Sequence, residues 1–174
     1  MTRPIFTIGH STRTAAEFAG LLDAHGVRQI ADVRTIPQSK RHPHFSRAAL
    51  EEFLGSRGIA YRHFPELGGL RRPRADSINT AWRHAGFRGY VDHMQTNDFR
   101  RGVRDLAQFA LHDHTSVLCA EAVWWQCHRR LLADALVVRG IPVRHILSSA
   151  EPKPHELSEF ARQHEGGVIY PGLL

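Results

Sequence analysis

The chain has 174 residues, a formal net charge of +6 and a hydrophobic content of 42%. These values fit one folded domain spanning residues 1–174 and exclude a disordered chain, and two cysteines are too few for a disulfide framework. No apolar run approaches the roughly 20 residues that a membrane-spanning helix needs. The first residues lead directly into an apolar strand, so we expect no signal peptide, a cytoplasmic location and no membrane partner.

The N-terminal part of the chain alternates between short apolar runs and amphipathic segments. Runs rich in β-branched residues predict three strands, at residues 5–8, 29–33 and 59–64. Thr14 and Glu17 have the spacing of a capping box, which predicts a helix that ends at Gly26. A second helix is predicted between Ser46 as N-cap and Gly58 as the stop signal.

The remainder of the chain continues the alternation after a long irregular connection. Helical periodicity runs from about residue 89 to 112 with a break near Asn97, and strands are predicted at residues 116–119 and 142–147. Further helices are predicted at residues 127–139 and 154–164. Strands that alternate with helices need crossover connections. We therefore predict an α/β fold with a mostly parallel sheet of about five strands and helices on both faces, in three layers.

Reactive side chains follow nearly every predicted strand. Ligands of open parallel sheets bind outside the carboxyl ends of the strands, so these residues are expected to share one site. Four of them are candidates for catalysis, as proton-transfer groups or as a nucleophile. These catalytic candidates are His10, Asp32, Cys119 and Glu121. Five further residues are candidates for substrate binding, namely Ser11, Arg34, Cys127, His128 and Arg129.

The segment from Cys119 to Arg129 is the most suggestive part of this set. A helix that begins near Cys127 would direct backbone N–H groups toward an anion, and with His128 and Arg129 it would lower the pKa of the Cys127 thiol. Alternatively, Cys127 packs as a small apolar side chain and Arg129 pairs with a carboxylate. Asp32 and Glu121 have the same two interpretations, as an acid/base pair or as ion-pair partners of Arg34 and Arg129.

The sequence predicts neither a metal site nor a cofactor. The spacing of Cys119, Cys127 and His128 lacks the short paired ligands of structural zinc sites, and adjacent residues on a helix point about 100° apart. Basic residues in two loops, with Phe45, Phe64, Trp82 and Phe87 as possible stacking surfaces, are compatible with nucleic acid as a partner. Alternatively, the basic residues of these loops are ordinary solvent-exposed side chains without a partner molecule.

The chain also resembles a known family, the domain of unknown function 488 (DUF488). The matching motifs run in order along nearly the whole chain and occupy residues 7–11, 32–34 with Pro37 and Ser39, 67–69, 119–121, 127–129 and 143–146. The resemblance implies a shared α/β fold and a shared site built from these motifs. It implies no particular reaction.

These observations give two functional hypotheses. The first is an enzyme that acts on an anionic substrate, such as a nucleotide, a nucleic acid or another phosphate-bearing molecule, at the carboxyl ends of the strands. The second is a non-catalytic module that binds a nucleotide or nucleic acid through the same basic rim.

Overall fold

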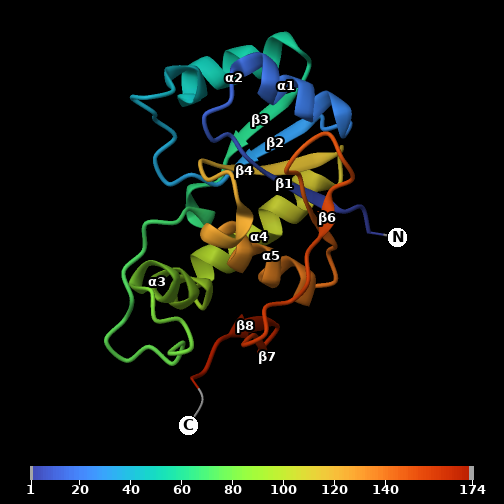
Figure 1. The fold of residues 1–174 in the computed structure, drawn as a ribbon. Helices are drawn as coiled ribbons and strands as arrows, with labels where there is room; N and C mark the ends of the chain where they lie inside the picture. Colours follow the sequence, from blue (N-terminus) through green and yellow to red (C-terminus); the bar gives the residue numbers. More distant parts are fainter. Residues whose placement is uncertain (1, 173–174) are drawn as a thin grey trace.

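The computed structural model describes residues 2–172, which are built around a six-stranded sheet in the order β3-β2-β4-β1-β5-β6 (Figure 1). The strands are β1 Ile5–Gly9, β2 Gln29–Asp32, β3 Ala60–His63, β4 Thr115–Cys119, β5 Val143–His145 and β6 Lys153–Pro154. All pairings among β1 to β5 are parallel, and only β6 runs antiparallel to its neighbour. The predicted mostly parallel α/β sheet is confirmed, with β6 as an additional short edge strand.

Helices cover both faces of the sheet, as predicted (Figure 1). They are α1 Ala15–Ala24, α2 Arg47–Ser56, α3 Ala85–Met94, α4 Asn97–Ala110 and α5 Arg129–Val138. Apolar side chains of α1 and α2, among them Phe18 and Leu50, pack with Ile8 of β1 on one face. Those of α3, α4 and α5 pack on the other face in a separate core. No helix within residues 2–172 is both long enough and apolar enough to span a bilayer.

The order of the strands creates a crevice at the carboxyl end of β4. This strand lies between β1 and β2. The chain continues from β1 into α1 and from β2 toward α2, and both helices lie on one face of the sheet. After β4 the chain instead continues into α5 on the other face. Connections that leave neighbouring strands in opposite directions leave a gap between them, which is the usual ligand position in such sheets. Gly9 pairs with Cys119 and Asp32 with Leu118, so these three strand ends meet at one edge.

Two predictions of local structure are wrong. The helix predicted at residues 154–164 does not form; β6 is followed by an irregular segment and by a hairpin of β7 Arg162–His164 and β8 Gly167–Ile169. The helix predicted from residue 127 begins at Arg129, with Cys127 in an extended conformation and His128 at the N-cap position. The second difference matters chemically, because Cys127 and His128 are then free of the helical spacing of side chains.

Candidate functional site: a cleft with two cysteines

A cleft of about 300 Å³ lies at the carboxyl ends of β1, β2 and β4. Most of the residues predicted for the site line it, namely His10, Arg34, Cys119, Glu121, Cys127 and His128. The opposite rim comes from two loops, through residues 35–39 and through Gly69 and Leu70. Ser11, Asp32 and Arg129 are not in the lining. The structure therefore gathers the two cysteines and two histidines around one space.

The two cysteines are in contact at the base of this cleft. Their Sγ atoms are 2.8 Å apart, and the residues are only 2% and 5% exposed. Cys119 ends β4, while Cys127 lies two residues before the start of α5, where the backbone N–H of Arg129 is directed at its Sγ over 3.5 Å. An N–H group at a helix start stabilises negative charge on such a sulfur.

His128 is held against Cys127. Its Nδ1 lies 3.5 Å from the Cys127 Sγ, and its Nε2 donates a hydrogen bond to the Val33 carbonyl over 3.1 Å. The donation from Nε2 leaves Nδ1 as the nitrogen that can accept the thiol proton. The ring also packs against Tyr90, with the ring centroids 5.0 Å apart. The geometry is that of a cysteine beside a base whose orientation is fixed by a third group.

The environment distinguishes the two thiols. The hydrogen bond from Cys119, with His128 and Arg129 nearby, holds the pKa of Cys127 well below its ordinary value despite burial. Burial and the contact with Cys127 raise the pKa of Cys119 well above its ordinary value. The arrangement consistent with both directions is a Cys119 thiol that donates to a Cys127 thiolate.

Glycines permit the close approaches on which this cleft depends. A Cβ on Gly9 would overlap the Glu121 carbonyl, so only glycine lets the loop after β4 cross the end of β1. A Cβ on Gly69 would lie 3.1 Å from Nδ1 of His128, the nitrogen that faces Cys127. Both glycines belong to the motifs identified in the sequence, and their role is to make room for the site.

His10 forms part of another wall of the cleft. Its ring stacks on Phe45 with a centroid distance of 4.4 Å, and Nδ1 donates to the Ser11 carbonyl over 2.9 Å. Burial lowers the pKa of His10 to about 4, with the Ser11 contact opposing this effect. The ring is therefore neutral near pH 7, with an unprotonated Nε2 that can accept a proton. Ser11 itself has a φ of 49° and lies outside the lining of the cleft.

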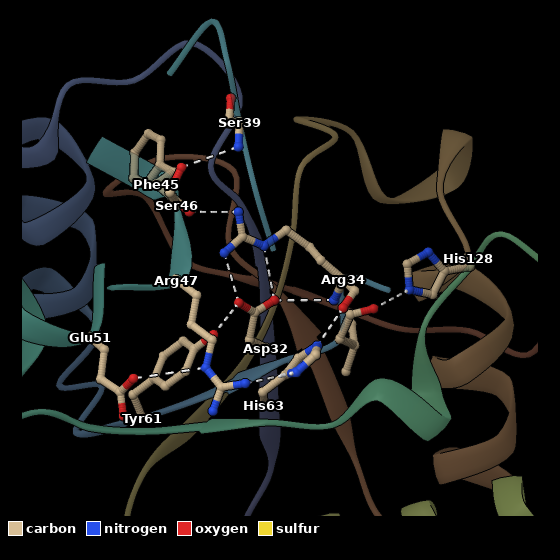
Figure 2. A network of polar contacts seen from close by, with 11 residues as sticks. Asp32, Arg34, Ser39, Phe45, Ser46, Arg47, Glu51, Tyr61, His63 and His128 are labelled. Atoms are coloured by element: carbon tan, nitrogen blue, oxygen red, sulfur yellow. Dashed lines mark hydrogen bonds and ion pairs between the residues drawn. The ribbon is translucent and has the colours of Figure 1, made fainter. Parts of the chain in front are cut away.

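Asp32 and Arg34 form a buried ion pair beside the cleft (Figure 2). Two guanidinium nitrogens of Arg34, Nε and Nη2, donate to the two carboxylate oxygens over 2.9 and 2.7 Å, and Nη1 donates to the Phe45 carbonyl. Tyr61 donates to the same carboxylate over 2.6 Å. With its oxygens occupied and its side chain wholly buried, Asp32 is better suited to holding the loops together than to proton transfer, which favours the ion-pair alternative.

Arg129 lies beneath the cleft and is 1% exposed. Its Nη2 donates to the carbonyl of Glu121 over 2.6 Å, and Nη1 donates to the Thr7 hydroxyl over 3.3 Å. The expected carboxylate partner is absent: no ion pair within residues 2–172 includes Arg129. Glu121 therefore accepts a hydrogen bond from this guanidinium through its backbone carbonyl, and the residue is exposed at the rim of the cleft.

Sequence reasoning missed a buried polar chain that continues from Arg129. The Thr7 hydroxyl contacts Nδ1 of His145 over 2.6 Å, and Nε2 of His145 contacts Nδ1 of His155 over 2.9 Å. His155 in turn donates through Nε2 to the Asp134 carboxylate over 2.7 Å. Burial, His155 and Arg129 together lower the pKa of His145 to about 3. His145 lies within the motif at residues 143–146, but no sequence signal joins it to Asp134 or His155.

The part of the chain between residues 2 and 172 contains no group of three or more His, Cys, Asp or Glu side chains placed to hold a metal ion. The fold and the site define the class of this protein as a three-layer α/β domain with paired cysteines at a switch point of the sheet. A family model described as domain of unknown function DUF488 matches residues 14–136 of the 174-residue chain. The chain belongs to this family. Neither the comparison with curated proteins nor that with solved structures gives a match.

Proposed function

We propose that the protein is an enzyme that uses the Cys127 thiolate as a nucleophile on a small anionic substrate bound in the cleft. The observation that carries this proposal is the set of groups around the Cys127 sulfur. Cys119 contacts it at 2.8 Å, and His128 Nδ1 and the Arg129 N–H each lie 3.5 Å from it. A thiolate stabilised in this way attacks an electrophilic carbon, phosphorus or sulfur centre, and a neighbouring histidine carries the proton.

The substrate class rests on size and charge. A volume of about 300 Å³ is at the small end of ligand sites and suits a molecule no larger than a nucleotide. The net charge of +6 and the exposed Lys40 and Arg41, which directly follow the rim segment 35–39, favour a negatively charged molecule. His10 is neutral near pH 7, so its Nε2 can accept a hydrogen bond from a substrate hydroxyl or from water.

A non-catalytic nucleic-acid module gains less support. Two aromatic residues considered as stacking surfaces, Phe45 and Phe64, are 1% and 0% exposed and cannot stack on a base. The alternative predicts binding to single-stranded DNA that weakens steeply with salt and is unchanged in Cys127→Ala.

The proposal is tested by the pH dependence of Cys127 alkylation with iodoacetamide, followed by peptide mass spectrometry so that the two cysteines are resolved. The expected midpoint lies below the roughly 8.5 of a free thiol, and it rises in His128→Asn because the base is lost. Inorganic phosphate or a nucleoside monophosphate is expected to slow alkylation in the wild type. An ordinary midpoint together with no protection by either anion would contradict the proposal.

A further inference from the structure

The cleft contains a second sulfur that a single-cysteine mechanism does not need. Cys119 and Cys127 are eight residues apart in the chain, and their sulfurs are in contact without a disulfide. Both residues line the cleft, so a small molecule that reaches one reaches the other. A purely structural cysteine would not require a second thiol at this distance in a cleft open to solvent.

The contacts of the two sulfurs differ in a way that assigns them different roles. Cys127 receives the N–H of Arg129 and lies beside Nδ1 of His128, which are the contacts of a nucleophile. Besides the Cys127 sulfur, to which its thiol donates, Cys119 has a long contact of 3.9 Å to the Glu121 carbonyl, an acceptor that does not stabilise a thiolate. Cys127 is therefore placed to act as the nucleophile, and Cys119 remains a protonated thiol beside it.

We propose that Cys119 is the resolving thiol of Cys127, so that a small hydroperoxide entering the cleft converts the pair into an intramolecular disulfide. This inference rests on the thiolate of Cys127 that the proposed function invokes. It adds a defined reaction, the two-electron reduction of a hydroperoxide, and a defined partner residue.

The reaction proceeds in two steps that balance. The Cys127 thiolate attacks the terminal oxygen of the hydroperoxide, the O–O bond breaks, and with one proton an alcohol or water leaves while Cys127 becomes a sulfenic acid. The Cys119 sulfur then attacks the Cys127 sulfur, an S–S bond forms, the S–O bond breaks, and water leaves with the proton of the Cys119 thiol. Two thiols and one hydroperoxide give one disulfide, one water, and one alcohol or second water.

The size of the oxidant follows from the burial of the sulfurs. At 2% and 5% exposure, neither cysteine is accessible to a protein disulfide or to a bulky tripeptide disulfide. Hydrogen peroxide or a small organic hydroperoxide fits a cleft of about 300 Å³. Closing the disulfide also removes the negative charge beside Arg129, so the oxidised protein loses the nucleophile until a dithiol restores it.

The experiment treats the fully reduced, full-length protein with one equivalent of hydrogen peroxide and follows intact mass and free thiols. The wild type is expected to lose both thiols together with the mass of two hydrogen atoms, and dithiothreitol is expected to restore them. Cys119→Ser is expected to gain one oxygen and to be trapped by dimedone at Cys127. Cys127→Ser is expected to keep its remaining thiol, and Cys119→Ala serves as a second variant should the serine perturb folding.

Several results would overturn the inference. One is the accumulation of a sulfenic or sulfinic acid in the wild type while one thiol remains free. The others are a disulfide between two molecules, and equal oxidation of the Cys119→Ser and Cys127→Ser variants. If alkylation shows a low midpoint at Cys127 but no intramolecular disulfide forms, only this inference fails. If Cys127 reacts neither with iodoacetamide at low pH nor with peroxide, the proposed function fails as well.

Discussion

Two buried arginines near the cleft, Arg34 just after β2 and Arg129 at the start of α5, have different kinds of partners. Arg34, 6% exposed, faces the Asp32 carboxylate with two guanidinium nitrogens (Figure 2), whereas Arg129, 1% exposed, meets backbone carbonyls and the Thr7 hydroxyl. Nε of Arg129 is buried and has no hydrogen-bond partner among residues 2–172. One positive charge is neutralised within its own network, and the other is not.

The difference explains why the thiolate is expected at Cys127. A buried cation without a carboxylate raises the free energy of the folded state unless another negative group lies close to it. The Cys127 sulfur contacts the backbone N–H of Arg129, and the Arg129 charge contributes, after Cys119 and His128, to the lowered pKa of this thiol. Asp134 is linked to Arg129 through the hydrogen-bonded chain of Thr7, His145 and His155 rather than by a direct ion pair. The Arg34 network stabilises the fold, whereas the Arg129 network stabilises negative charge on the Cys127 sulfur.

The largest expected effect tests the neutralised pair. Asp32→Asn keeps the size of the side chain but places an amide N–H against the donors of Arg34 and Tyr61, leaving the Arg34 charge buried and unpaired. We expect the free energy of unfolding to fall by about 3–5 kcal/mol, measured by urea denaturation. The matched control is Asp76→Asn, which removes a solvent-exposed partner of Arg74, and no measurable change is expected there. Equal effects of the two substitutions would contradict the comparison.

The second prediction concerns how the free energy of unfolding depends on pH below 6.5. It tests His10 and His145, the histidines that accompany the Arg34 and Arg129 networks. The pKa of His10 is lowered to about 4 and that of His145 to about 3, in both cases mainly by burial. The unfolded chain binds these protons near pH 6.5 and the folded chain does not, so stability falls as the pH drops from 6.5 toward these values.

At pH 4.5 this difference amounts to roughly 3 kcal/mol for His10. His10→Gln and His145→Gln are each expected to flatten the profile, with the effect of His145→Gln continuing to lower pH. His112→Gln, at an exposed residue, is the control. Urea denaturation between pH 7 and pH 3.5 measures the profile, and a wild-type stability that does not change over this range would be incompatible with buried neutral histidines.

The third expected effect concerns the thiolate itself. Arg129→Met retains much of the volume of the side chain and removes the charge, so the alkylation midpoint of Cys127 is expected to rise by about 1–2 pH units. Arg34→Met is expected to leave this midpoint nearly unchanged, because Asp32 already neutralises that guanidinium. Arg129→Lys keeps a charge and is expected to restore part of the shift. A similar rise in both methionine variants would show that the two arginines act alike.

The same comparison shows what could be predicted from the sequence. Asp32 and Arg34 are two residues apart after a strand, so their pairing was foreseen as an alternative. Arg129 donates to the Thr7 hydroxyl and to the backbone carbonyls of Glu121 and Ala122, and because any residue supplies a carbonyl, no residue type marks those partners in the sequence. An influence of His128 on the Cys127 thiol was expected from the sequence, but the two residues precede the helix, which begins at Arg129, rather than lying on it.

The wrong final helix has a related cause. Leu157, Phe160 and Ala161 have the spacing of an apolar helical face, but Leu157 and Phe160 are 40% and 41% exposed. The segment is fixed instead by polar contacts, since His155 and the backbone N–H of Ser158 both bond to the buried Asp134 carboxylate. Periodicity detects burial of apolar faces and is silent about a carboxylate 24 residues away in the chain. The sheet and the strand ends were predictable because local patterns specify them.

The smallest expected effect separates hydrogen bonding from charge. Tyr61→Phe removes one hydrogen bond to the Asp32 carboxylate, which still holds Arg34, so we expect a loss of about 1–2 kcal/mol in the free energy of unfolding. Tyr170→Phe removes the corresponding hydroxyl from Asp134 in the fully buried network, where the loss is expected to be at the upper end of this range. Neither substitution changes a charge near the sulfurs, so the Cys127 alkylation midpoint is expected to stay in place in both. A shift in Tyr170→Phe alone would mean that the buried chain from Asp134 to Arg129 also tunes the thiolate, and it would make the Arg129 network a relay rather than an isolated cation.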